Sequence, residues 1–153
     1  MSFQLTVEGF ANAGPVPKRH TCDGADLSPA VRWSGVPPEA RSLALVLEDP
    51  DAPSGTFTHW MLWDIPPSVD SLPSGFGSTP DIKAGRNDFG VAGYRGPCPP
   101  RGHGPHRYYV TMYALAVDMV KLEEGSSRLE FDRAVLPHVV AQVQRMGRYE
   151  RRS

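Results

Sequence analysis

Apolar residues in this chain come in short stretches that glycine and proline interrupt at frequent intervals. Phe3, Leu5 and Val7 alternate with polar neighbours, which is the period-two pattern of a half-buried strand. Residues 43–47, 57–65 and 108–117 are rich in branched and aromatic side chains, and each segment predicts a further strand. Residues 66–93 contain so many prolines and glycines that only short extended pieces fit there. These four strands, with roughly four weaker ones, predict a mostly β protein arranged as a β-sandwich.

One short helix is predicted in the C-terminal region of the chain. Ser127 and Glu130 have the spacing of a capping box, in which each side chain bonds a backbone N–H at the helix start. Pro137 lacks an N–H and would destabilise a helix interior by about 3 kcal/mol, so the helix should end or kink there. Residues 143–149 predict a last strand. The apolar side of the helix is assigned to Leu129, Ala134, Val135 and Leu136.

Length and charge limit the classes of protein to which the chain can belong. Its 153 residues are enough for one domain, expected over 1–153, with a core that needs neither a disulfide nor a metal. A net charge of −1, from 16 basic and 17 acidic residues, argues against nucleic acid as a partner. No apolar run approaches the roughly 18 residues of a membrane-spanning helix, so no stable membrane insertion is expected. Residues 1–10 do not resemble a signal peptide, and we therefore expect a cytoplasmic protein.

The two cysteines, Cys22 and Cys98, are too few for a disulfide framework or a thiolate zinc site. We expect two reduced structural thiols. A single bridge between them, or a reactive Cys98, are the alternatives that the sequence leaves open.

Residues 48–65 contain the first group of side chains that suggests a binding site. Asp49 and Asp51 follow an apolar strand, and the prolines at positions 50 and 53 stop sheet pairing there, so both carboxylates lie at a strand end. The next strand carries His59. Period-two geometry places Trp60 on the opposite face, and it places four residues on the face of His59: Phe57, Met61, Trp63 and Ile65.

A second group follows in residues 93–105, a loop in which glycine and proline alternate closely. Glycine allows a backbone to approach a ligand, and proline lowers the entropy lost when a loop is held in one shape. The strand expected over residues 106–115 begins with His106 and Tyr108, which share a face. Together with His59 these side chains could donate hydrogen bonds to an anion, although a purely structural loop would use similar residues.

These segments resemble the signature of a known family. They are similar to the signature segments of the phosphatidylethanolamine-binding protein family. The matching segments are residues 49–53 (Asp-Pro-Asp-Ala-Pro), residues 59–60 (His-Trp), and the stretch from residues 96–100 (Gly-Pro-Cys-Pro-Pro) to 106–108 (His-Arg-Tyr). The short prokaryotic branch, often called Raf kinase inhibitor-like, is the nearest. The resemblance implies an antiparallel β-sandwich with an anion pocket at one end. Motif position would place these residues around it: Asp49, Asp51, Pro53, His59, Gly96, Pro97, Pro99, Pro100, His106 and Tyr108.

We therefore expect a non-catalytic binding protein that recognises phosphate or a phosphorylated group. It would need no cofactor, and it could inhibit or modulate a partner enzyme, with a kinase or a protease as candidate targets. Relatives of the prokaryotic branch further imply a homodimer.

Two other functions stay open at this stage. A metal-dependent hydrolase could use the ligand types of His59, His103, His106, Asp49 and Asp51, but the chain has neither the H-E-x-x-H spacing nor a G-x-S-x-G turn. A protein-interaction scaffold could expose Trp33 and Trp60, although core packing is the more common place for such residues.

Overall fold

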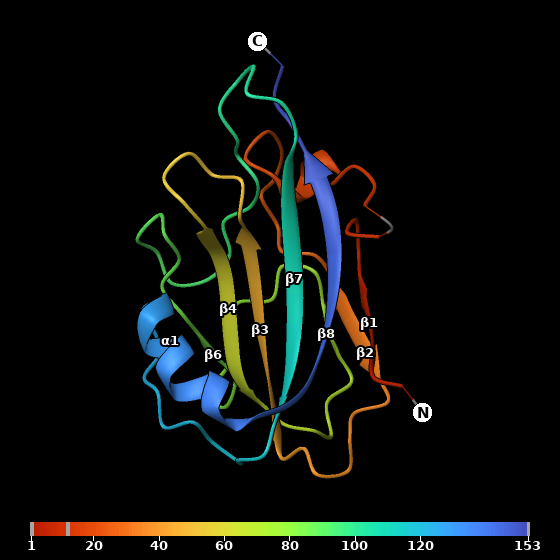
Figure 1. The fold of residues 1–153 in the computed structure, drawn as a ribbon, viewed down its shortest axis with the longest axis vertical. Coiled ribbons are helices and arrows are strands. Elements are labelled where there is room, and N and C mark those ends of the chain that lie inside the picture. Colours follow the sequence, from red (N-terminus) through yellow and green to blue (C-terminus); the bar gives the residue numbers. More distant parts are fainter. Residues whose placement is uncertain (1, 12, 153) are drawn as a thin grey trace.

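Two antiparallel sheets form the framework of the protein, which a computed structural model describes for residues 2–11 and 13–152 (Figure 1). The smaller sheet has the strand order β1 (Gln4–Val7), β2 (Val31–Ser34) and β5 (Ser71–Leu72). The larger has the order β6 (Lys83–Ala84), β4 (Phe57–Ile65), β3 (Ser42–Asp49), β7 (His106–Leu115) and β8 (Val139–Tyr149). The helical elements are α1 (Arg128–Val135) and two single turns, η1 (Lys18–His20) and η2 (Leu136–His138).

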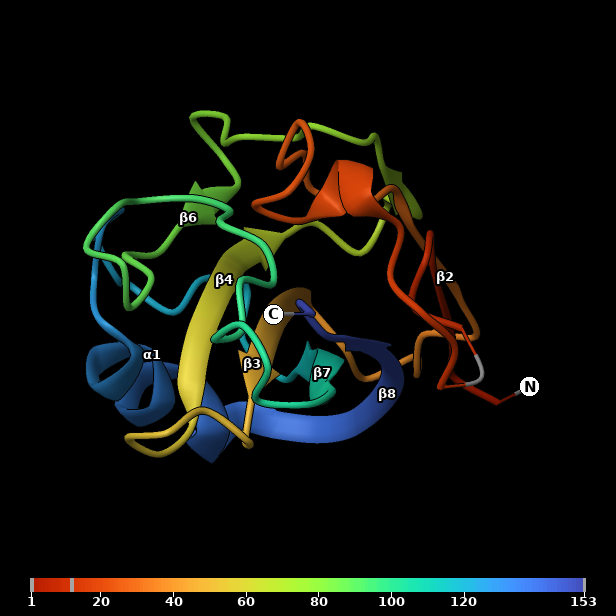
Figure 2. The ribbon, with the colours of Figure 1, turned by 90° about the horizontal axis from the view of Figure 1, so that it is seen from above.

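The central strand β3 separates two apolar clusters. Leu43, Leu45 and Leu47 face the cluster between the two sheets, whereas Ala44 and Val46 face a smaller cluster beneath α1. The smaller sheet and α1 accordingly lie on opposite sides of the larger sheet (Figure 2). Because both faces of β3 are covered, its sequence is continuously apolar rather than alternating.

Most of the elements expected from the sequence are present. The four clear strands correspond to β1, β3, β4 and β7, and residues 66–93 contain only the two-residue strands β5 and β6. Ser127 and Glu130 form the expected capping box at the start of α1. The helix ends at Val135, just before Pro137, and the last strand begins earlier than expected, at Val139. Trp33 and Trp60 are buried, so the structure contradicts an exposed aromatic patch at these positions.

The apolar side of α1 was predicted only in part. Val135 is buried as expected, but Leu129 and Leu136 are 59% and 45% exposed. Phe131, which the prediction missed, is fully buried against Trp63. The helix has only 8 residues, and only positions 131 and 135 of it are buried. These two positions are four residues apart and therefore lie on one narrow face.

Strand β4 contains a β-bulge at His59 that interrupts the expected alternation. Trp60 pairs with Leu47, but Thr58 pairs with the next residue of β3, Glu48, so His59 is an extra residue opposite this step. In a bulge of this kind consecutive side chains turn to the same side of the sheet, and the strand bends. His59 and Trp60 therefore both lie on the side of the inter-sheet core.

The predicted faces of β4 were wrong for Trp60, Met61 and Trp63. Met61 and Trp63 pack in the cluster beneath α1, not with His59. Ile65 lies in the inter-sheet cluster together with Trp60. A one-residue insertion reverses the face of the residues that follow it, because side chains alternate with a period of two. A second register shift, between Leu43 and Leu45 of β3, returns Ile65 to the predicted side.

Cys22 and Cys98 form a disulfide with a Cα–Cα distance of 5.4 Å, so the expectation of two reduced thiols was wrong. The two residues are 76 positions apart, and only the fold brings the loop after β6 against the segment after η1. Disulfides persist mainly in oxidising compartments. None of the helices in the described residues is long and apolar enough to span a membrane.

Candidate ligand-binding site

A cavity of about 190 Å³ opens beside the loop over residues 94–100, at the end of β3 and the starts of β4 and β7. Asp49 ends β3, His59 comes from the bulge of β4, and His106 and Tyr108 begin β7. The remaining wall is apolar and consists of Ala52, Pro53, Phe57, Phe89, Cys98, Pro99 and Pro100. The two segments selected from the sequence thus meet at one cavity.

A chain of hydrogen bonds links three side chains on one side of the cavity. His106 is buried, and its Nδ1 lies 2.6 Å from Oδ2 of buried Asp49. Its Nε2 lies 2.6 Å from Nδ1 of His103, an exposed residue of the preceding loop. The other carboxylate oxygen of Asp49 accepts the N–H of Asp51 at 2.7 Å. If Nδ1 of His106 donates to Asp49, its Nε2 accepts from His103, so hydrogen bonds join the cavity wall to an exposed residue.

His59 lies on the opposite side of the cavity in an aromatic environment. Its Nδ1 donates to the carbonyl oxygen of Arg95 at 2.7 Å, and its Nε2 has no partner within residues 2–11 and 13–152. The ring contacts Phe57, Phe89 and Tyr108 at centroid distances of 4.9, 5.6 and 5.5 Å. Burial lowers the pKa of His59, although the bond to Arg95 opposes the shift. Near neutral pH the ring is therefore uncharged and its Nε2 is a free acceptor.

Tyr108 is the cavity's hydrogen-bond donor near neutral pH. Burial raises the pKa of its phenol well above the ordinary value, and the negative charge of Asp49 and hydrogen bonding to that carboxylate add to the shift. The hydroxyl group therefore stays protonated. A ligand that fills the cavity meets the acceptor nitrogen of His59, the hydroxyl group of Tyr108, the hydrogen-bonded pair of Asp49 and His106, and an apolar wall.

Comparison with known proteins identifies the family of this chain. The family described as "Phosphatidylethanolamine-binding protein" matches residues 6–150. The chain belongs to the phosphatidylethanolamine-binding protein family. A relative from Aquifex aeolicus, named "UPF0098 protein", is 46% identical over 145 residues that cover 93% of this chain and 85% of the relative.

Two solved structures of the phosphatidylethanolamine-binding protein family have the same fold. The homologue CT736 from Chlamydia trachomatis superposes with a TM-score of 0.88 at 37% identity, over 98% of both chains. YbcL from Escherichia coli, described as a member of the mammalian PEBP family, superposes with a TM-score of 0.92 at 31% identity, over 98% of this chain and 99% of its own. The antiparallel β-sandwich predicted from the family resemblance is thus confirmed.

Within this family member, Asp51 is directed away from the cavity. Its Oδ1 accepts Nη2 of Arg107 at 2.7 Å, and its Oδ2 accepts Nε of the same guanidinium at 2.9 Å. This pairing lowers the pKa of Asp51 to about 2. The carboxylate fixes the start of β7 against the turn after β3, and it does not line the cavity.

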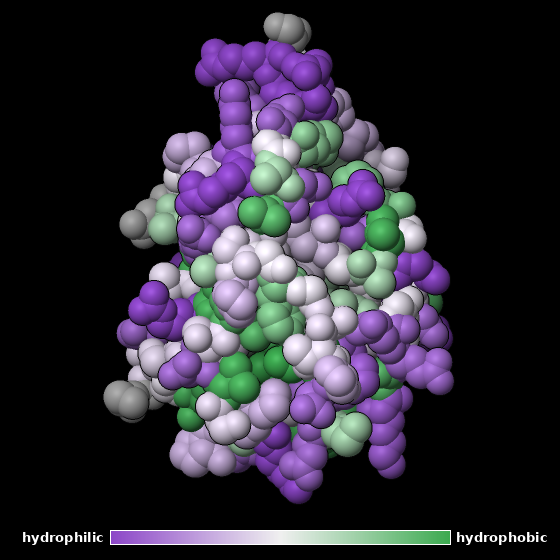
Figure 3. All heavy atoms as spheres, turned by 180° about the vertical axis from the view of Figure 1, so that it is seen from behind, coloured by the Kyte–Doolittle hydropathy of each residue, from purple (hydrophilic) through white to green (hydrophobic). Residues whose placement is uncertain are grey.

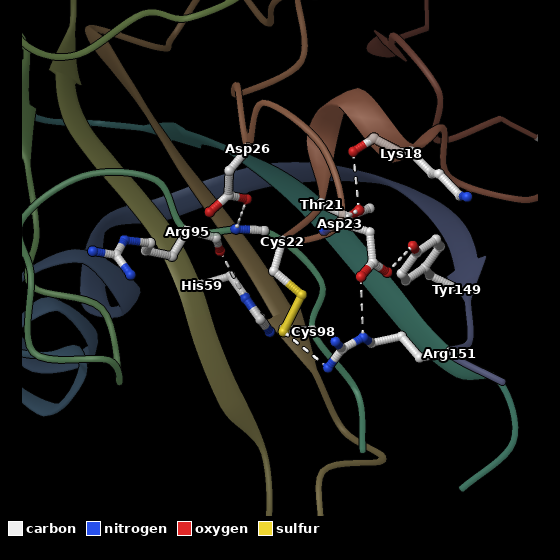
Figure 4. The surroundings of a disulfide bond; sticks show 11 residues. Lys18, Thr21, Cys22, Asp23, Asp26, His59, Arg95, Cys98, Tyr149 and Arg151 are labelled. Carbon is white, nitrogen blue, oxygen red and sulfur yellow. Dashed lines mark hydrogen bonds and ion pairs between the residues drawn. A yellow bond between two sulfur atoms is a disulfide. The ribbon is translucent and has the colours of Figure 1, made fainter. Parts of the chain in front are cut away.

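The predicted loop residues divide into two pairs. Pro99 and Pro100 line the cavity, whereas Gly96 and Pro97 attach the loop to the segment after η1. The N–H of Gly96 donates to Oδ1 of Asp26 at 2.8 Å (Figure 4). An added Cβ at Gly96 would lie 1.9 Å from the carbonyl oxygen of His20, so only glycine allows this close approach.

The prediction from sequence missed several wall residues. Phe89 is 44% exposed and stands alone in a polar, glycine-containing loop, where no period marks it. Phe57 was placed on the face of His59 but was not included in the pocket, and Cys98 was treated as structural. The carbonyl group of Arg95 could not be found from its side chain, because backbone groups carry no sequence signal.

No group of three or more metal-ligand side chains lies close enough to hold a metal ion in the part of the chain that the structure describes. His106 is engaged by Asp49 and His103, and Nδ1 of His59 by Arg95. The hydrolase alternative therefore has no preformed ligand set.

Proposed function

We propose that this protein is a non-catalytic binding protein whose cavity takes a phosphate group, either free or on a small phosphorylated compound. The observation that carries the proposal is the pairing of Tyr108, a neutral donor, with the free Nε2 of His59 across one cavity. A singly protonated phosphate has both an oxygen that accepts from Tyr108 and a hydroxyl group that donates to His59.

The charge of Asp49 is compatible with an anion because its oxygens are already engaged. One accepts from His106 and the other from the N–H of Asp51. The carboxylate therefore supports the histidine, and it does not face the ligand as an unpartnered charge.

Cavity size limits the ligand class. About 190 Å³ corresponds to roughly six water molecules, at 30 Å³ each in the liquid. This volume suits a phosphate group with a few further atoms, such as phosphoethanolamine, and it excludes a whole lipid. The apolar wall would contact the ester carbons.

Calorimetric titration with inorganic phosphate and with O-phosphorylethanolamine tests the proposal. Removing the donor by Tyr108→Phe should weaken binding about tenfold, since one hydrogen bond to a charged group contributes roughly 1.5 kcal/mol. His59→Gln should weaken it to a similar degree. His138→Gln, a histidine of η2 outside the cavity, is the matched control. Equal affinities of the wild type and both cavity variants would refute the proposal.

Three further expectations stay predictions. Inhibition of a kinase or a protease is tested with purified enzymes and with the Tyr108→Phe variant as control. The homodimer is tested by measuring the molar mass of the protein in solution by light scattering. The hydrolase alternative predicts stoichiometric zinc in protein purified without chelator, so protein free of zinc yet fully folded would remove it.

A further inference from the structure

The disulfide in the cavity wall is chemically asymmetric. Cys22 is exposed to solvent, whereas Cys98 is half-buried and lines the cavity. A dissolved thiol can therefore reach the sulfur of Cys22 more easily than that of Cys98. Figure 4 shows the bond together with its neighbours His59 and Arg151.

A guanidinium group lies against one of the two sulfur atoms. Nη1 of Arg151 is 3.5 Å from Sγ of Cys98. Nε of Arg151 lies 3.3 Å from Asp23, whose carboxylate also accepts the hydroxyl group of Tyr149. Arg151 is thus held in place beside Cys98. A neighbouring positive charge stabilises a thiolate, and the sulfur with the more stable thiolate is the better leaving group.

We propose that this disulfide is a thiol-exchange site that takes a small monothiol. The thiolate of the incoming molecule attacks Sγ of Cys22 and forms a mixed disulfide there. The Cys22–Cys98 bond breaks, and its electron pair leaves on Cys98 as a thiolate beside Arg151. A second monothiol then attacks the mixed disulfide and releases reduced Cys22, so two monothiols are oxidised to one disulfide for each bond reduced.

Exchange at this site would change the cavity as well as the bond. The disulfide fixes the loop that carries Pro99, Pro100 and the carbonyl group of Arg95, which orients His59. After reduction the loop keeps only its hydrogen bonds, and a thiolate of Cys98 adds negative charge to the wall. Both changes oppose an anion, so phosphate affinity should fall on reduction. This coupling, unlike the exchange itself, rests on the proposed function.

The exchange is tested with oxidised protein and glutathione. Samples are quenched with iodoacetamide at timed points, and the cysteine peptides are identified by mass spectrometry. We expect glutathione on Cys22 and the alkyl group on Cys98. Glutathione on Cys98, an equal distribution, or no reaction within the time that reduces the unfolded protein would overturn the proposal.

The role of Arg151 is tested by its rate effect. A positive charge nearby lowers a thiol pKa by about 1–3 units, so Arg151→Gln should slow exchange roughly 3- to 30-fold. Arg152→Gln is the matched control, because it removes the same charge from a side chain that is 88% exposed. Equal slowing by both variants would show a general field effect and refute the assignment. The effect of Arg151→Gln should disappear in urea, where the contact is lost.

The coupling is tested by phosphate titration of oxidised protein, reduced protein and the Cys22→Ser, Cys98→Ser double variant. We expect roughly tenfold weaker binding in the last two. Equal affinity in all three would overturn the coupling. If the oxidised protein does not bind phosphate, the proposed function fails, whereas the exchange rates still decide whether the thiol site exists.

Discussion

Replacing Gly96 by alanine should destabilise the fold at the point where the cavity loop is attached. The new Cβ would lie 1.9 Å from the carbonyl oxygen of His20 and 2.7 Å from Oδ1 of Asp26. Carbon–oxygen contacts below about 3.3 Å are repulsive, so the two segments must separate by about 1.4 Å. The shift would break the bond from Gly96 to Asp26, and the bond of 2.6 Å from Tyr94 to the oxygen of His20.

The expected loss of stability follows from these two bonds. A bond to a charged carboxylate contributes about 1.5–3 kcal/mol and a neutral one about 1 kcal/mol, so the sum is about 3 kcal/mol. For a chain of this size, 1 kcal/mol lowers Tm by about 2–4 °C, which gives a decrease of roughly 6–12 °C. Gly96 does not have a positive φ, so the effect is steric and no backbone strain contributes.

Thermal unfolding followed by circular dichroism, under non-reducing conditions, measures this decrease. Gly77→Ala is the matched control because a Cβ there meets nothing within 4 Å and φ is not positive. It should leave Tm within about 2 °C of the wild type. A Gly96→Ala variant with the Tm of the Gly77→Ala control would refute the reasoning.

Three further predictions concern other parts of the fold. Burial lowers the pKa of His59, so the unfolded chain binds more protons below about pH 6.5 and stability should fall as pH decreases. His59→Gln should therefore reduce the pH dependence of the urea midpoint between about pH 7.5 and 5.5, and an unchanged slope would contradict this. Arg128 lies 2.6 Å from Glu48, so Arg128→Met should lower the free energy of unfolding by about 2 kcal/mol, and Arg133→Met, on the exposed side, should not. Ser127→Ala should remove about 1 kcal/mol by loss of the helix cap, and an unchanged urea midpoint would argue against it.

Local sequence patterns predicted the elements because their causes are local. Alternating apolar residues identified the long strands, the capping box located the start of α1, and Pro137 located its end. Local patterns also located the two segments of the cavity. Acidic residues follow one strand, and a loop rich in glycine and proline precedes another, so each pattern marks a strand end. The family resemblance added the antiparallel arrangement that joins them.

Contacts between distant residues depended on the tertiary structure. The bulge that turns His59 into the cavity arises from the register between β3 and β4, which the sequence of β4 alone does not encode. Asp49 and Asp51 look equivalent in sequence, yet one supports His106 and the other pairs with Arg107. Their partners are consecutive residues of β7, of which His106 is buried and Arg107 is exposed.

The sequence by itself determined which segments form strands and which of them carry the polar side chains of the site. Only the tertiary structure decided that Cys22 and Cys98 meet, that the backbone of Arg95 orients a histidine, and that a guanidinium lies on a sulfur atom. Periodicity depends on residues a few positions apart. Contacts between residues far apart in the chain, such as the two cysteines at a separation of 76 positions, are set by how whole elements pack.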